Sequence, residues 1–428
     1  MEMNLSKLRK ISRWRTLLFG FLAVAFGLII IVNGVNFTKV AIDLLMSYFF
    51  LVGLVNLFLH FIVGKKEVPV IPEIVRIVLA NLIGLLNRLS SLPVDIVIII
   101  LGIYQLATAA VYGITYYLYR KNQSKGALRF LLDTVLYGLI GLATVFSPSV
   151  NGQVQFFFLG MYLVMLGFSN IRDGLFFDND RERTQLRRHI RINLPIILAA
   201  FIPAENLDQF NRFIRGQNVH EPTQTVYSLV KDEKKTADLE VLVHTSKESL
   251  FGAIGHVDIC YQGQVISYGS YDVFSERCKG MIGDGVLFKV SKDDYIELCK
   301  KESKKTLFGY SLSLTEQERE AVEKRLAQID QWLIEWEPPA DLKDGRHTYA
   351  YKLRHELGAR LYKFTTSRFK TYFVMSTNCC LLADSIIGQA GTDMLDIRGI
   401  IAPGTYQSYL QYEFESANDL VIARTVYQ

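Results

Sequence analysis

Long apolar runs fill the first 177 residues of this 428-residue chain, and they constrain its fold more than any other feature. Five runs, at 16–33, 40–63, 94–117, 130–146 and 154–171, have about the 17–25 residues needed to cross some 30 Å of hydrocarbon. A sixth run, 74–86, is shorter and carries Arg76. It is interpreted either as a sixth span or as a buried or interfacial helix.

Positive charges decide between these two readings. Lys and Arg are concentrated before the first run, at 65–66, at 120–129 and at 172–191, whereas the alternate loops hold only Lys39 and Arg88. Six spans place every strongly basic loop on one side, as the positive-inside rule requires, and five spans would divide them. We therefore predict an integral protein of a bacterial-type plasma membrane, with the lipid bilayer as a partner and both termini in the cytoplasm.

The charge balance differs between the two halves of the chain. Residues 1–177 carry 15 Lys+Arg against 7 Asp+Glu, and the remainder carries 32 against 35. The charged fraction of 21% is below the roughly 25% usual for soluble proteins. This composition excludes a uniformly basic nucleic-acid binder, and no nucleic-acid partner is expected.

The membrane half repeats internally. Seven residues recur at an offset of 114, namely Leu17, Leu18, Gly27, Leu28, Tyr48, Gly53 and Asn56, matched by Leu131, Leu132, Gly141, Leu142, Tyr162, Gly167 and Asn170. A further match at about half this offset indicates three similar hairpins with close helix packing at glycines. Residues 10–177 resemble the acid-resistance (HdeD-like) membrane protein family, which is also built from three helical hairpins. An oligomer formed through this domain is compatible with the pattern.

Few ionisable residues lie within the spans, and they form no polar path across the membrane. Asp43, His60 and Asp95 lie near span ends, which leaves Arg76 and Asp133. A transporter is therefore the weakest of the functional readings.

The pattern changes after the membrane half. We expect a membrane domain at 1–177, a basic juxtamembrane segment at 178–224 and an α+β domain at 225–428. Short strand-like runs are predicted at 239–244, 285–290, 362–367 and 370–375, with a hairpin at 255–268 that turns at Gln262-Gly263. A helix is predicted over 314–336, with Thr315 and Glu318 forming a capping box.

Cys379 and Cys380 follow a predicted strand and begin an apolar helix, with Thr377 or Asn378 as its N-cap. The free N–H groups and positive dipole end of a helix N-terminus favour a thiolate. In a cytosolic domain both cysteines are expected to be reduced. The alternative is two small side chains packed under a helix end.

The second candidate is His256, in the run Gly255-His-Val-Asp-Ile-Cys-Tyr. Alternation places His256 and Asp258 on one face of the strand. If the turn is centred on Gln262-Gly263, Asp258 lies opposite Ser267 and His256 lies opposite Gly269, which leaves room at the imidazole ring.

Together, a histidine on a strand followed 123 residues later by an Asn-Cys helix start resembles the circularly permuted papain-like families. These include relatives of NlpC-type peptidases and of lecithin:retinol acyltransferase, and the segment 400–406 is similar to their closing segment. The resemblance covers about residues 225–415. It implies Cys379 as nucleophile rather than Cys380, and His256 as base. The third, orienting position is assigned to Ser267, with Asp258 and Asp272 as rivals.

The leading hypothesis is therefore a membrane-anchored, cytosol-facing cysteine hydrolase or acyltransferase that acts on an amide, ester or acyl group of a peptide or membrane-associated substrate. The alternative is a non-enzymatic stress or acid-resistance type of membrane protein with a degenerate papain-like binding domain. No Cys/His spacing forms a zinc site, and no cofactor is expected.

Overall fold

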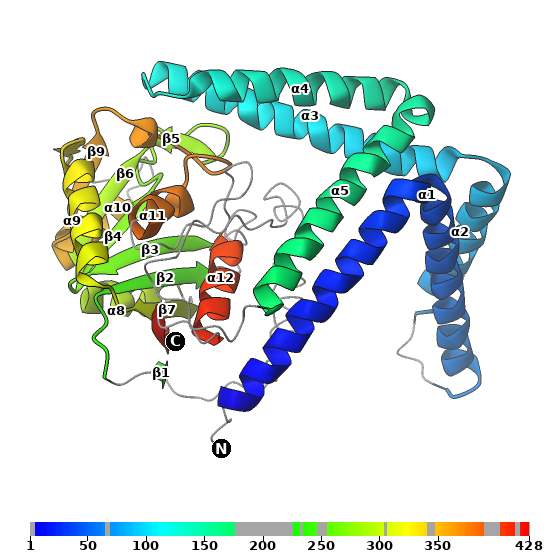
Figure 1. Cartoon of the computed structure of the whole chain (residues 1–428), viewed down its shortest axis with the longest axis horizontal. Helices are drawn as coiled ribbons and strands as arrows, with labels where there is room; N and C mark the ends of the chain where they lie inside the picture. Colours follow the sequence, from blue (N-terminus) through cyan, green and yellow to red (C-terminus); the bar gives the residue numbers. More distant parts are fainter. Residues whose placement is uncertain are drawn as a thin grey trace. The chain divides into compact units, whose positions relative to one another are not determined.

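The structure, a computed structural model, describes residues 5–64, 69–175, 226–231, 234–245, 255–303, 306–339, 347–388, 403–415 and 420–427. Long helices make up the part up to residue 175, and a large β-sheet with its helices makes up the part from residue 226 onward (Figure 1). The predicted juxtamembrane segment 178–224 lies outside the described residues.

The described residues of the first part form five helices: α1 (Leu5–Phe61), α2 (Val70–Leu89), α3 (Leu92–Lys121), α4 (Ala127–Phe146) and α5 (Pro148–Leu175). All five are long and apolar enough to cross a membrane, which confirms the membrane character predicted from the apolar runs. The short run 74–86 lies within α2, whose 20 residues have the length of a span. The first two runs lie together in α1, whose backbone is non-helical at Asn33 (φ −147°, ψ 41°).

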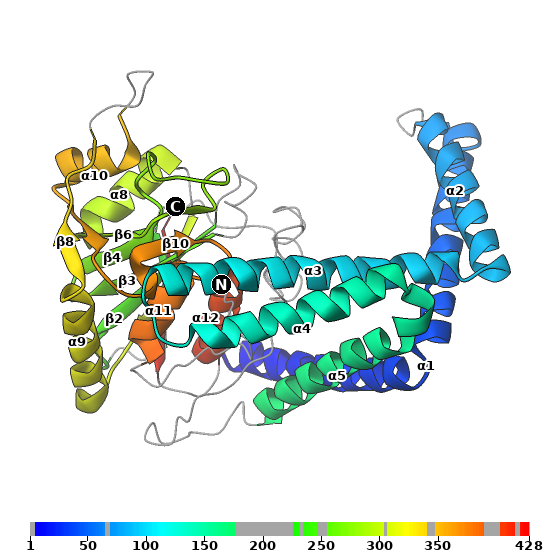
Figure 2. The same cartoon turned by 90° about the horizontal axis from the view of Figure 1, so that it is seen from above.

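Glycines bring α1 and α5 into close contact. Gly20 and Gly27 on α1 are seven residues apart, and so are Gly160 and Gly167 on α5. A Cβ atom at Gly167 would lie 2.6 Å from the Gly20 carbonyl oxygen, and one at Gly27 would lie 2.7 Å from the Gly160 carbonyl oxygen. The two helices run side by side (Figures 1 and 2), and the predicted close packing at glycines is confirmed at this pair.

Polar side chains within the helical part have partners in the protein. Gln105 Nε2 on α3 donates to Gln155 Oε1 on α5 at 2.5 Å, and Gln155 Nε2 donates to Thr144 Oγ1 on α4 at 2.5 Å. Within α2, the Arg76 guanidinium pairs with Glu73 at 2.7 Å. Interhelical hydrogen bonds of this kind help to hold apolar helices together in a membrane, where the hydrophobic effect does not drive helix association because the lipid tails are equally apolar.

The second part is built on a nine-stranded sheet among the described residues, and every neighbouring pair of strands in it is antiparallel. Its order is β1-β11-β7-β2-β3-β4-β6-β9-β8. The strands are β1 (Val226–Val230), β2 (Leu239–Thr245), β3 (His256–Tyr261), β4 (Gln264–Gly269), β6 (Val286–Ser291), β7 (Thr306–Leu312), β8 (Leu333–Glu335), β9 (Arg360–Phe364) and β11 (Val421–Tyr427), while β5 (Ile282–Asp284) and β10 (Thr371–Phe373) form a separate pair.

Helices cover both faces of this sheet. The helices α9 (Glu316–Asp330), α11 (Cys379–Ile387) and α12 (Pro403–Glu415) share one core with Val257 and Ile259 of β3. The helices α8 (Lys292–Ser303) and α10 (Tyr349–Leu357) share a second core with Leu242 and Cys260. Because β2 and β3 are buried on both faces, alternate residues of each strand enter different cores.

The predicted strands 239–244 and 285–290 and the predicted hairpin correspond to β2, β6 and β3–β4, and in the structure they belong to an antiparallel sheet. The capping box of Thr315 and Glu318 is present, but the predicted helix 314–336 ends at Asp330. Residues Leu333–Glu335 form the edge strand β8 instead, because they pair with β9. The apolar pattern of these residues is compatible with a strand as well as with a helix.

Replacing Gly167 by alanine is expected to lower the thermal stability of the detergent-solubilised protein, since the new Cβ would meet backbone atoms of α1 at 2.6 and 2.7 Å. Gly138→Ala in α4 is the matched control, because its Cβ would meet only the Ala109 Cβ, at 3.9 Å. That change should be neutral or stabilising by about 0.5–1 kcal/mol. Equal melting temperatures for the two variants would contradict the α1–α5 contact.

Candidate active site

The helix α11 begins at a well-defined cap. The Asn378 side chain accepts a hydrogen bond from the Leu381 N–H at 3.0 Å and donates one to the Val374 carbonyl at 2.9 Å. Asn378, rather than Thr377, is therefore the N-cap, and Thr377 instead donates to the Thr371 carbonyl at 2.8 Å. Cys379 and Cys380 are the first two residues of α11, as predicted.

A buried tyrosine anchors the segment that leads into α11. Tyr268 on β4 is 1% exposed, and its hydroxyl donates to the Phe369 carbonyl at 2.9 Å, just before β10. The backbone N–H of Val374 donates to the Met281 carbonyl at 3.0 Å, next to the β10–β5 pair. These bonds join the central sheet to the start of α11.

His256 is the first residue of β3, on a hairpin whose turn residues Gln262 and Gly263 have φ of 50° and 76°. The observed register pairs Ile259 with Ile266 and Tyr261 with Gln264, which is the register predicted from a turn at these two residues. Because side chains alternate, His256 and Asp258 share a face of β3.

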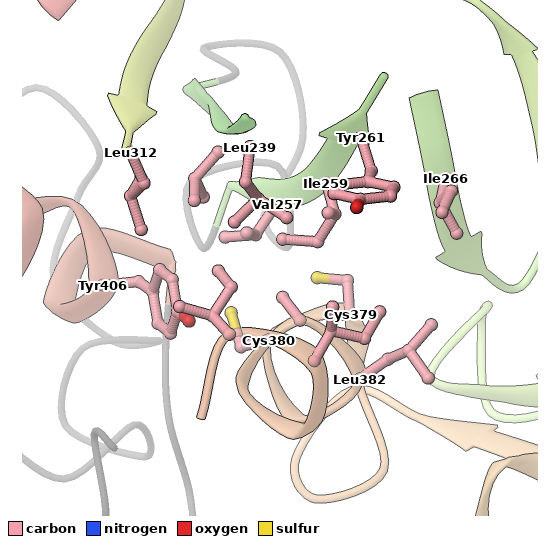
Figure 3. Close-up of a cluster of buried hydrophobic side chains, with 14 of the residues drawn as sticks. Leu239, Val257, Ile259, Tyr261, Ile266, Leu312, Cys379, Cys380, Leu382 and Tyr406 are labelled. Atoms are coloured by element: carbon pink, nitrogen blue, oxygen red, sulfur yellow. The ribbon is translucent and has the colours of Figure 1, made fainter. Parts of the chain in front are cut away.

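Cys379 meets His256 where β3 begins. Its sulfur is hydrogen-bonded to the His256 side chain and to the Val257 backbone N–H. Both cysteines of α11 face the apolar residues of β3 (Figure 3). Two residues 123 positions apart are thus brought into contact by the packing of α11 on the sheet.

Hydrogen bonds and charge favour the thiolate of Cys379. The Cys380 thiol, as hydrogen-bond donor, lowers the pKa of Cys379, and the His256 imidazolium lowers it further, so that it lies well below 9.0 despite burial. Burial alone would lower the pKa of His256, but the negative charges of Cys379 and Asp258 raise it well above 6.5. These two shifts in opposite directions favour a thiolate–imidazolium pair over the neutral pair.

Cys380 has the opposite properties. Burial and the neighbouring Cys379 raise the pKa of the Cys380 thiol well above 9.0, and its side chain is fully buried. Tyr372 on β10 also keeps its proton, because burial and the charge of Cys379 raise its pKa well above 10, and its hydroxyl bonds to the Cys379 sulfur. Of the two cysteines, Cys379 is thus the one suited to act as a nucleophile.

Three oxygen atoms surround the Nε2 atom of His256. Asp258 Oδ1 lies 2.9 Å away, at an ion-pair distance, and Ser267 Oγ and Tyr271 OH lie at hydrogen-bond distances of 3.0 and 3.1 Å. Ser267 and Tyr271 also bond to each other at 2.7 Å. The structure thus brings Ser267 and Asp258, two of the residues named for the orienting position, to the same ring nitrogen.

The third residue named for that position, Asp272, lies elsewhere. Its carboxylate pairs with Lys363 at 2.6 Å and accepts from the Phe274 N–H at 3.1 Å. No contact between Asp272 and His256 is present in the described part of the chain, so Asp272 acts in the turn after β4.

Two site residues had no strong signal in the sequence. His244 is the sixth residue of β2, and its Nε2 lies 2.6 Å from Asp258 Oδ2. Tyr271 follows β4, and a Cβ at Gly269 would overlap its ring at 2.8 Å. The room that Gly269 leaves beside His256, noted from the sequence, is therefore taken by Tyr271. Alternation within 239–244 would have placed His244 on a sheet face, but not beside Asp258.

Cys379 and His256 both line a pocket of about 210 Å³. The pocket is lined by side chains and glycines from β3, β4, the turn after β4 and the start of α11: Gly255, His256, Gly269, Ser270, Tyr271, Glu276, Gly280, Tyr372, Val374, Asn378 and Cys379. A reacting group placed there would meet the thiolate and the imidazole together. Among the described residues, no group of three or more His, Cys, Asp or Glu side chains is arranged to hold a metal ion.

Cys379 should react with iodoacetamide at pH 6, where an ordinary thiol with a pKa near 8.5 is almost fully protonated. The pKa of Cys379 lies well below 9.0, so its thiolate persists as pH falls and is lost only when pH passes through that lower value. Mass spectrometry would follow alkylation of Cys379 from pH 5 to 9, with the exposed Cys278 of the same chain as reference. Parallel loss of both labels on acidification would contradict the ion pair.

Comparisons with protein-family models, with curated proteins and with solved structures found no match to this chain. The resemblances to the HdeD-like and papain-like families therefore stay predictions. What this site does is inferred from the contacts of its own residues.

Proposed function

We propose that this chain is a membrane-anchored cysteine hydrolase or acyltransferase whose catalytic domain has a circularly permuted papain-like arrangement. The observation that carries the proposal is the hydrogen-bonded Cys379–His256 pair at the wall of a pocket. Acyl transfer through a thioester requires a nucleophilic thiol, a nearby base and a group that orients the base. Here the thiol lies at the start of a helix, the imidazole lies at the start of a strand, and polar groups contact the imidazole.

The chemistry follows from the charge states. The Cys379 thiolate attacks the carbonyl carbon of an amide, ester or thioester, and the His256 imidazolium gives its proton to the leaving group. The acyl group is then held as a thioester on Cys379. Water, or another nucleophile, gives a proton to the neutral His256 and takes the acyl group, which restores the thiolate and the imidazolium.

Donors for the developing oxyanion are present beside the sulfur. The first N–H groups of a helix have no carbonyl partner within the helix, and those of Cys379 and Cys380 occupy this position in α11. The Tyr372 hydroxyl lines the same pocket and bonds to the sulfur. Fixed donors of this kind stabilise the tetrahedral intermediate of acyl transfer.

The contacts at the Nε2 atom of His256 argue against a degenerate binding domain. A degenerate site would lack a group to orient the imidazole, whereas Nε2 here has Ser267 and Asp258 at 3.0 and 2.9 Å. These contacts therefore favour an active site over a non-enzymatic stress or acid-resistance protein with a degenerate binding domain.

The helical part supports six spans in five helices. The apolar part of α1 extends over 49 residues, or about 74 Å at 1.5 Å per residue, more than twice a hydrocarbon core of about 30 Å. The non-helical backbone at Asn33 lies between its two apolar runs. Division of α1 there yields two spans, and the distribution of Lys and Arg then places both termini and the sheet domain in the cytoplasm.

With this topology the sheet domain is tethered to the membrane on its cytoplasmic side. A lipid, a lipidated protein or another membrane-associated acyl compound would then be within reach of the pocket. Cell-wall peptides, the substrates of many NlpC-type peptidases, lie on the other side of the membrane.

Labelling in isolated membranes tests the chemistry. A thiol-reactive acyl probe should label the chain, and Cys379→Ala should abolish this labelling, because no other side chain combines a thiolate with the pocket. Cys278→Ala, a change of the exposed thiol, is the matched control and should retain it. His256→Ala should reduce the labelling rate by about 10²–10⁴-fold. Unchanged labelling of Cys379→Ala would remove the assignment.

A membrane-impermeant maleimide tests the topology. Asn36 is exposed in α1, beyond the break at Asn33, so Asn36→Cys should be labelled in intact cells. The native Cys278 should be labelled only after permeabilisation, and this second result serves as the control for cell integrity. If α1 crossed the membrane as one span, Asn36→Cys would remain unlabelled in intact cells.

A further inference from the structure

The buried carboxylate of Asp258 lies between two histidines, His256 and His244. The Asp258 side chain is 0% exposed. Its Oδ1 lies 2.9 Å from His256 Nε2, and its Oδ2 lies 2.6 Å from His244 Nε2 and accepts a hydrogen bond from the Tyr295 hydroxyl at 2.9 Å. A carboxylate in such a place is strongly destabilised unless it is paired and hydrogen-bonded.

The strand register accounts for this arrangement. In the β2–β3 pair, His244 lies directly opposite His256, and Leu242 lies opposite Asp258. The side chain of Asp258 therefore reaches diagonally to His244, and the two imidazole rings are 5.8 Å apart in a T-shaped arrangement. His244 is buried and belongs to the same face of the sheet as Asp258.

The remaining groups that face this cluster keep their protons. Tyr295 from α8 and Tyr271 after β4 have pKa values raised well above 10, by burial first and then by the charge of Asp258. Tyr349 from α10 lies beside both tyrosines, and on β7 the apolar Leu307 pairs with His244. The two imidazole nitrogens, His256 Nε2 and His244 Nε2, are therefore the basic atoms nearest to the Asp258 carboxylate.

The short distance between His244 and Asp258 ties the carboxylate to β2. His244 Nε2 lies 2.6 Å from Asp258 Oδ2, at an ion-pair distance, and the Tyr295 hydroxyl donates to the same oxygen at 2.9 Å. Both contacts of Oδ2 are made by groups other than His256, so they do not depend on the state of that ring.

This independence is significant for the proposed reaction, in which His256 loses its proton and regains it. With a neutral His256, Asp258 would be a buried carboxylate with little compensation and would tend to take up a proton. The two contacts on Oδ2 favour its ionised form, and its Oδ1 then remains beside His256 Nε2 and favours a proton on that nitrogen. The tautomer protonated at Nε2 leaves Nδ1 to exchange a proton with Cys379 or with the leaving group of the substrate.

We propose that His244 is a positioning residue of the thiol site, which acts through Asp258 to hold His256 in the tautomer that serves Cys379. The proposal rests on the proposed function of the Cys379–His256 pair. It places the orienting group of this site on two adjacent strands, as a histidine–aspartate–histidine unit, with Ser267 and Tyr271 as additional neighbours of the same nitrogen.

The test compares His244→Leu and His244→Gln in the full-length protein in membranes. Glutamine can place an N–H near the position of His244 Nε2, and leucine cannot. The control is the same change to leucine at His355, an exposed histidine on α10. The readout is the pH midpoint for iodoacetamide alkylation of Cys379, measured by mass spectrometry with Cys278 as internal reference.

We expect His244→Leu to raise the midpoint of Cys379 by about one pH unit or more, a change equivalent to a tenfold loss of thiolate. His244→Gln should stay within a few tenths of a unit of the parent, as should His355→Leu. A purely structural role for His244 would leave the midpoint of the folded protein unchanged.

The outcomes separate the two proposals. A parent protein whose Cys379 titrates like the exposed Cys278 would remove the proposed function itself. A low midpoint in the parent that is unchanged in His244→Leu would overturn only the role of His244. If His244→Leu does not fold, Tyr295→Phe removes the other donor to Oδ2 and should raise the midpoint in the same direction. A midpoint unchanged in Tyr295→Phe, together with loss of fold in His244→Leu, would also count against the inference.

Discussion

The packing of α11 against β3 is the interaction on which the site depends. Cys379 and Cys380 belong to the same buried core as Val257 and Ile259, so apolar contacts hold the helix start at the end of the strand that begins with His256 (Figure 3). The thiolate and the imidazolium thus meet without a flexible segment between them. An apolar core provides a rigid support for a charged pair, because closely packed interiors resist displacement of their elements.

Burial of this pair creates an electrostatic problem that the neighbouring residues solve. Cys380, Tyr372 and the Val257 N–H donate to the sulfur, and Asp258 Oδ1 lies 2.9 Å from His256 Nε2. The pKa of Asp258 would be raised by burial, yet the two histidines hold it far below its usual range. Cys379, His256 and Asp258 therefore each have a partner of opposite charge or a hydrogen-bond donor, as buried charges require.

The sequence predicted the parts of the site that depend on local structure. Cys379 was identified by an Asn-Cys helix start, and Ser267 and Asp258 followed from strand alternation and a turn at Gln262-Gly263. Tyr271 and His244 were missed for different reasons. Tyr271 reaches His256 only because Gly269 leaves space for its ring. His244 approaches Asp258 only through the β2–β3 register, a pairing of two strands that was not predicted from the sequence. In the helix predicted for 314–336, the N-terminal cap was correct and the C-terminal end was wrong, since pairing with β9 is a contact between residues distant in sequence.

The amino-acid sequence by itself determined that the first part of the chain forms long apolar helices and that the second part combines short strands, a hairpin and helices, because hydrophobic length and alternation are local properties of the chain. It also determined where α11 begins and which residues share a face of the β3–β4 hairpin. Only the tertiary structure decided that Cys379 meets His256, that Cys380 and Tyr372 act as donors to the sulfur, and that His244 supports Asp258. These contacts join elements far apart in the sequence, and their geometry follows from how the sheet register and two helix–sheet cores bring those elements together.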